Sequence, residues 1–85
     1  MELERVGSIL YVRGLSEKEL RLAKKASDEQ LEGEFGNASK RFEKVVWRKV
    51  EKEMKRQGFP KSLVETFHEA SFWVEDDTLV FDYGW

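Results

Sequence analysis

The chain has 85 residues with no cysteine and one histidine, a composition that excludes a disulfide framework and argues against a structural zinc site. Its 15 basic and 17 acidic side chains give a net charge of −2 at pH 7, and 40% of its residues are hydrophobic, enough for one small core. No apolar run approaches the roughly 20 residues that span a bilayer, and the first residues lack the basic and apolar regions of a signal peptide. We therefore expect a single cytoplasmic domain, residues 1–85, that does not contact membranes.

Charge is distributed unevenly along the chain. Residues 1–37 have a net charge of −2, and residues 38–61 carry nine basic and three acidic side chains for +6. Residues 62–85 carry six acidic side chains and no Lys or Arg, for −6. Such asymmetry indicates either two surfaces with different partners or two halves of the chain that attract each other.

A short strand is predicted at residues 8–13. Leu10 and Val12 alternate there with Tyr11 and Arg13, the period of two expected of a strand with two different faces. Leu10 and Val12 would face the core. Tyr11 and Arg13 would share the outward face.

A helix is predicted to begin directly after this strand, at Ser16, and to end near residue 31. Ser16 and Glu19 have the S-x-x-E spacing of a capping box, in which each side chain satisfies a free backbone N–H of the other residue. Leu15 and Leu20 occupy the hydrophobic positions on either side of this cap. The angle between strand and helix is therefore expected to be fixed.

A longer helix is predicted at residues 38–57. Val46, Val50 and Met54 form an apolar ridge, and Gly58 is suited to end the helix. Five basic residues follow helical spacing on the opposite side: Arg41, Lys44, Arg48, Lys52 and Lys55. This basic stripe is either a phosphate-binding surface or an ordinary solvated helix face.

The last part of the chain, residues 62–85, is predicted to form a short helix and an acidic, aromatic hairpin. Ser62 and Glu65 have the spacing of a second capping box. From Phe72 onward the apolar residues alternate, and Asp76-Asp77 are placed as the tight turn, which would pair Val74 with Leu79 and Phe72 with Phe81. The predicted order is β-α-α-α-β-β, a small α+β fold with an N-terminal strand and a C-terminal hairpin.

The segment VRGLSEKEL at residues 12–20, with two helices after it, resembles the ribbon-helix-helix family of DNA-binding repressors and antitoxins. The resemblance covers about residues 10–55. It implies a homodimer in which two N-terminal strands pair into an antiparallel ribbon that enters the major groove of DNA. Arg13 and Tyr11 would then contact bases. The start of the second helix would clamp phosphate, a role that falls on Asn37, Ser39, Lys40 and Arg41.

The acidic, aromatic tail has two interpretations. Antitoxins of this family neutralise a basic toxin with a C-terminal extension, so the resemblance implies a basic protein partner for this segment. The candidate partner-binding residues are Trp73, Asp76, Asp77 and Trp85. Alternatively, the hairpin completes the core of its own chain, as aromatic residues at strand spacing usually do.

Two functions therefore remain open. The first is a DNA-binding transcriptional regulator of ribbon-helix-helix type, antitoxin-like through its tail. The alternative is a monomeric α+β protein–protein interaction module without a nucleic-acid role, in which the N-terminal strand pairs with the C-terminal hairpin in a three-stranded sheet. No catalytic or metal-ligand constellation can be assembled around the single His68, so neither an enzyme nor a cofactor is expected.

Overall fold

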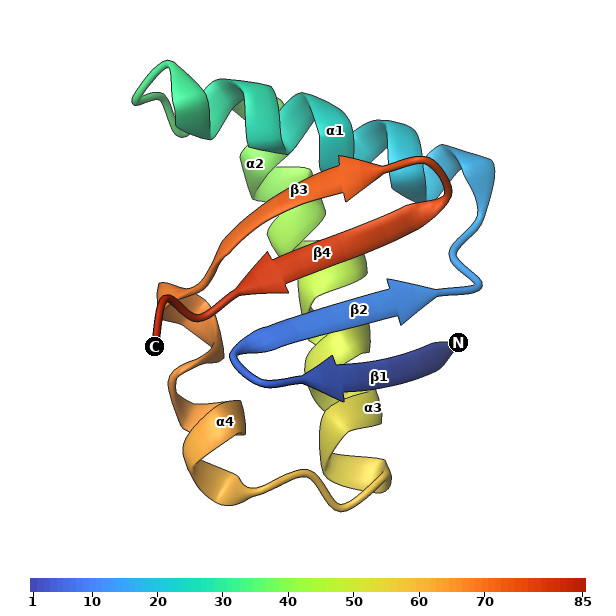
Figure 1. Cartoon of the computed structure of the whole chain (residues 1–85). Helices are drawn as coiled ribbons and strands as arrows, with labels where there is room; N and C mark the ends of the chain where they lie inside the picture. Colours follow the sequence, from blue (N-terminus) through green and yellow to red (C-terminus); the bar gives the residue numbers. More distant parts are fainter.

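Two hairpins, one from each end of the chain, form one antiparallel sheet in the computed structural model, which describes residues 1–85 (Figure 1). The sheet has four strands in the order β1-β2-β4-β3. Their bounds are Glu2–Val6 for β1, Ile9–Arg13 for β2, Ser71–Glu75 for β3 and Thr78–Asp82 for β4. All helices lie on one face of this sheet, and Figure 1 is seen from the open face. The α+β class is thus confirmed.

The strand β1 is not among the predicted elements, which form a three-stranded sheet at most. Its sequence ELERV offers only two apolar residues, and its burial pattern is that of an exposed strand. The turn between β1 and β2 carries the signal that could have found it. Gly7, followed by Ser8, adopts a φ of +60°, which suits a two-residue hairpin turn.

The first helix, α1 (Glu17–Leu31), begins where the sequence predicts. Both hydrogen bonds of the predicted capping box are present. Ser27, buried in the middle of the helix, donates its hydroxyl to the carbonyl oxygen of Phe72 at 3.0 Å. This bond holds α1 along the outer edge of β3 (Figure 1).

The predicted second helix is one continuous helix with a π-helical turn in its middle. It comprises α2 (Asn37–Phe42), the π-helical turn η1 (Glu43–Trp47) and α3 (Arg48–Arg56), and we call it the long helix. Its buried hydrophobic residues recur every four positions, at Phe42, Val46, Val50 and Met54. Four residues of an α-helix turn by about 400°, so such a ridge would drift by about 40° per step. The wider π-helical turn absorbs this drift, which keeps the ridge on the sheet.

The third predicted helix forms as two short pieces, α4 (Lys61–Glu65) and the 3₁₀-helix η2 (Phe67–Glu69). The capping box predicted at Ser62 and Glu65 is wrong. The cap residue is Pro60, and no side chain caps this helix. Because the helix begins at Lys61, Ser62 lies inside its first turn and cannot act as the cap.

The core lies between the helices and the inner face of the sheet. Phe72 pairs with Phe81 and Val74 with Leu79, as the predicted hairpin register requires. In the turn, Asp76 lies in the left-handed region with a φ of +53°. Asp tolerates this conformation better than most residues. Phe42 of the long helix stacks on Phe72 with ring centroids 4.5 Å apart. The C-terminal hairpin is therefore part of the core of its own chain.

Candidate functional site

The helical side of the molecule carries an unusual number of unpaired cations. Of the 15 basic side chains, ten are exposed and belong to none of the six ion pairs. One of them, Arg5, lies on β1. The other nine lie on α1 and the long helix: Lys18, Arg21, Lys24, Lys25, Lys40, Arg41, Lys44, Arg48 and Lys52. The predicted basic stripe is thus exposed, and α1 extends it.

A shallow groove of about 500 Å³ runs between α1 and the long helix inside this basic region. We call it the basic groove. Its cationic lining is Lys18, Arg21 and Lys25 of α1 and Arg41 of α2. The stripe predicted from the sequence does not include α1, although these three residues follow the i, i+3, i+7 spacing of a single helix face.

The same groove has an apolar component. Leu22 of α1 and Val45 of the π-helical turn line it between the cations. The Val45 residue is 49% exposed, one of few large hydrophobic residues left open to solvent. A groove that is both apolar and cationic suits a ligand that is both apolar and anionic.

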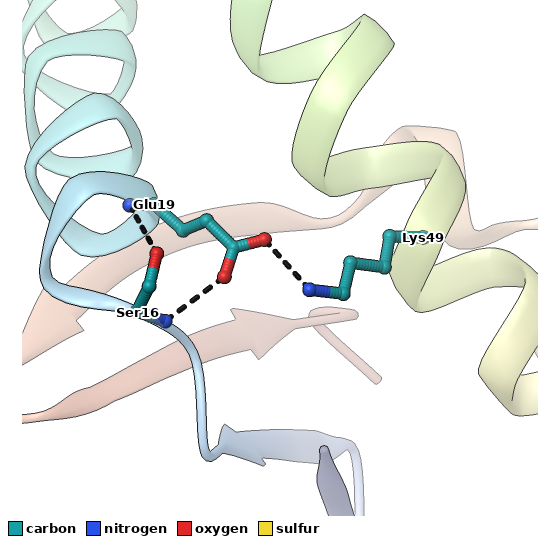
Figure 2. A network of polar contacts seen from close by, with 3 residues as sticks. All are labelled: Ser16, Glu19 and Lys49. Atoms are coloured by element: carbon teal, nitrogen blue, oxygen red, sulfur yellow. Dashed lines mark hydrogen bonds and ion pairs between the residues drawn. The ribbon is translucent and has the colours of Figure 1, made fainter.

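A polar network fixes one end of the groove (Figure 2). The Ser16 backbone N–H donates to a carboxylate oxygen of Glu19 at 2.9 Å, and the Glu19 N–H donates to the Ser16 hydroxyl at 3.1 Å. The other Glu19 oxygen accepts from the ammonium of Lys49 at 2.9 Å. The capping box therefore also ties the start of α1 to α3, which sets the spacing of the two groove walls.

These contacts make the network sensitive to acid. Partial burial acts to raise the pKa of Glu19, but the hydrogen bonds from Ser16 and Lys49 outweigh it, so the pKa is lowered from 4.5. A carboxyl with a lowered pKa stabilises the fold above its unfolded-state pKa and loses that contribution as pH falls through the folded value.

We therefore expect Glu19→Gln to lower the melting temperature at pH 7 and to lower it less, or not at all, near pH 3. The glutamine cannot attract Lys49 as an ion, and at low pH the protonated glutamate cannot either. Thermal melts followed by circular dichroism at both pH values measure the difference. Glu17→Gln, an exposed neighbour in the same helical turn, is the matched control, and an equal effect of both variants would contradict this role of Glu19.

A second carboxylate, Glu29, occupies the predicted phosphate site. Its oxygens accept the backbone N–H groups of Gly36 at 3.1 Å, Ala38 at 3.3 Å and Ser39 at 2.8 Å, and the Ser39 hydroxyl at 2.6 Å. The Ser39 hydroxyl, followed by these N–H groups, lowers the pKa of Glu29. An added Cβ at Gly36 would lie 2.7 Å from a Glu29 oxygen, so a larger residue there would displace the carboxylate from these donors.

This arrangement corrects the prediction for the start of the long helix. Ser39 is 3% exposed and already donates to Glu29, so its donors are not open to a phosphate. Asn37 and Lys40 are exposed on the first turn of α2. Arg41 lines the basic groove, as described above.

The predicted base-contacting residues lie on the other side of the molecule, on the open face of the sheet. Arg13 donates to the carboxylate of Glu4 at 2.8 Å, and its guanidinium lies 5.4 Å from the ring centroid of Tyr11. Their strand, β2, is hydrogen-bonded to β1 along one edge and to β4 along the other. The strand expected at a free edge is therefore interior, because two strands of the same chain occupy the positions that a second copy would need.

The predicted partner-binding residues of the tail are dispersed. Trp73 is half-buried on the open sheet face and donates its indole N–H to Glu75 at 2.8 Å. Asp76 and Asp77 are exposed in the turn, and Trp85 is 65% exposed. None of the six ion pairs joins the acids of this hairpin to the long helix. The basic long helix and the acidic hairpin therefore form separate charged surfaces.

The tail is instead anchored through its own aromatic residues. The Tyr83 hydroxyl donates to the carbonyl oxygen of Leu63 at 2.8 Å. Burial raises the pKa of Tyr83 to about 12. This bond fastens the end of β4 to α4.

Comparisons with protein-family models, with curated proteins and with solved structures find no match to this chain. The structure brings no three His, Cys, Asp or Glu side chains together where they could hold a metal ion. None of its helices has both the length and the apolar character needed to cross a membrane. The basic groove brings four cations that belong to no ion pair together at one place.

Proposed function

We propose that this chain is a monomeric protein–protein interaction module that binds an acidic, amphipathic helix of a partner protein in the basic groove. The observation that carries the proposal is the unpaired set Lys18, Arg21, Lys25 and Arg41 around Leu22 and Val45. Pairing of β2 with β4 inside one chain supports the monomeric state, since this strand needs no second copy to complete it.

The shape and chemistry of the groove favour this ligand. Two packed helices offer a concave surface in which the apolar face of a third helix can lie, with contacts repeating at i, i+3, i+4 and i+7. Carboxylates flanking that apolar face would meet the cations of the walls. Complementary charge of this kind raises the association rate and selects the partner, and it makes binding sensitive to salt.

Several features favour a protein ligand over DNA. Phosphate groups gain nothing from the apolar residues that line the groove. At the start of α2, Glu29 already accepts the backbone N–H that a phosphate would need. The whole chain has a net charge of −2, so its long-range field does not attract a polyanion as that of a basic domain would. A DNA-binding regulator with Arg13 and Tyr11 as base contacts stays a prediction, and the experiment below addresses it.

Fluorescence anisotropy tests the proposal with three labelled probes. The first is a helical peptide of about 15 residues with Leu along one face and Glu beside it, the second replaces each Glu with Lys, and the third is a DNA duplex of about 20 base pairs. The acidic peptide is expected to bind and to weaken as salt rises. The double variant Arg21→Glu, Lys25→Glu is expected to weaken it by about tenfold or more, or about 1.4 kcal/mol.

Lys61→Glu is the matched control, because Lys61 is a highly exposed cation on α4, outside the groove. It should leave the affinity for the acidic peptide unchanged. Failure of the acidic peptide to bind, or equal affinity for the basic one, would refute the proposal. Tighter binding of the duplex, lost in the double variant, would establish a nucleic-acid function in its place.

A further inference from the structure

A separate cavity of about 170 Å³ opens where the end of α1, the π-helical turn and η2 meet. Four aromatic residues line it, together with an acidic residue and the single histidine: Phe35, Phe42, Trp47, Phe72, Glu43 and His68. We call it the aromatic pocket. It shares no residue with the basic groove, so its chemistry is independent of that surface.

Three of the four aromatic walls, Phe42, Trp47 and Phe72, are held in place by packing. Phe42 and Phe72 lie almost parallel, with an interplanar angle of 13°. Trp47 stands nearly perpendicular to both, with centroid distances of 6.2 Å to Phe42 and 6.4 Å to Phe72. Phe35, which is 58% exposed, comes from the loop before α2 and lies next to Gly36, whose N–H is fixed by Glu29. A preformed wall loses little conformational entropy when a ligand binds.

The π-helical turn adds a negative charge to these walls. Glu43 is its first residue and Trp47 its last, and both line the pocket. Glu43 is exposed and belongs to none of the six ion pairs. The pocket thus combines aromatic rings with a carboxylate that has no cation of its own.

We propose that the aromatic pocket binds a small alkylammonium group, one whose positive charge is surrounded by methyl or methylene groups. Aromatic rings attract such a cation through their quadrupole, best of all Trp, while its alkyl surface gains from leaving water. The Glu43 carboxylate supplies the counter-charge. Lys40 and Lys44 are close to Glu43 on the same helix and weaken the negative potential there, so recognition depends on direct contact of the ligand with the rings and the carboxylate.

The volume limits what can enter. At about 170 Å³ the cavity is well below the roughly 300–1,000 Å³ of pockets for drug-sized ligands, so it admits a head group and not a whole nucleotide. The same group occurs in free quaternary ammonium molecules such as choline and in methylated lysine side chains. Both sources share the chemistry that the pocket would recognise.

Titration calorimetry and amide NMR shifts test this proposal with matched probes. Choline is compared with 3,3-dimethylbutan-1-ol, its neutral isostere, and a trimethyllysine peptide with the same peptide carrying unmodified lysine. Choline is expected to bind with a dissociation constant of about 1 mM and to shift the amides of the π-helical turn. Its isostere should bind at least about tenfold more weakly. A still tighter trimethyllysine peptide would identify a protein ligand, and equal affinity would show that the head group alone is recognised.

Glu43→Gln keeps the shape of the pocket and removes its charge, and it is expected to weaken choline binding by about tenfold. Glu51→Gln, on the same helix and outside the pocket, is the matched control. Phe35→Ala, at an exposed position, should weaken binding without affecting the fold. Equal binding of choline and its isostere, or no effect of Glu43→Gln, would overturn the proposal. The groove variant Arg21→Glu, Lys25→Glu should bind choline normally, so each proposal can fail without the other.

Discussion

Ending the chain at Ser71, which removes β3 and β4, is expected to abolish cooperative folding. Phe72, Leu79, Val80 and Phe81 are all buried, and burial of each such side chain contributes about 1.5–3 kcal/mol. Their sum is comparable to the whole free energy of unfolding of a small domain, about 5–15 kcal/mol. Without them the ridge of the long helix would face water. Far-UV circular dichroism and a thermal melt measure the loss.

A shorter truncation, ending at Tyr83, is the control. It removes only Gly84 and the exposed Trp85 and retains the Tyr83 bond to Leu63, so it should melt cooperatively. If the chain ending at Ser71 also kept full helicity and a cooperative melt, the hairpin would not be core. That result would support the interpretation of the tail as an extension that binds a basic protein partner.

Phe67→Ala is expected to lower the free energy of unfolding by about 3–5 kcal/mol. Phe67 is fully buried, and its ring centroid lies 4.6 Å from that of Trp47 and 4.5 Å from that of Phe81. Removing the ring leaves a cavity between the 3₁₀-helix, the long helix and β4 that rigid neighbours fill only in part. Urea unfolding curves with a common slope measure the change.

Phe35→Ala is the matched control for that measurement, since the same substitution is made at a position that is 58% exposed. Its effect should stay within about 0.5 kcal/mol. A comparable loss in both variants would mean that the aromatic cluster around Phe67 is not where the stability of the core resides.

Local patterns predicted the local structure well. The capping box at Ser16, the extent of the long helix and the register of the C-terminal hairpin each depend on residues close together in sequence. The segment VRGLSEKEL likewise predicts a strand that runs into a capped helix, and this is what forms. Such a segment carries no information on which strands border it. The ribbon-helix-helix resemblance therefore gives no indication that β2 pairs with β1 on one side and with β4 on the other.

The candidate sites depend on contacts between elements, which spacing alone does not determine. The carboxylate of Glu29 reaches Ser39 only because the intervening loop folds back on α1, and no motif in the sequence marks it. The basic groove needs α1 and the long helix to lie side by side. Its α1 cations could have been identified from their spacing, and Val45 lies one turn after Arg41 on the long helix, but neither pattern shows that these two helix faces adjoin.

The position of β1 bears on whether sheets of different copies can pair at their edges. An unpaired sheet edge can template pairing with another chain and so begin aggregation. The β3 edge is closed by α1 through Ser27, which leaves β1 as the one sheet edge that no helix or strand covers (Figure 1). Three of its five residues, Glu2, Glu4 and Arg5, are charged, and pairing of two copies at this edge would bring such charges close together. Charged side chains on an exposed edge strand oppose that pairing, so we expect the strand least evident in the sequence to limit edge-to-edge association of the sheet.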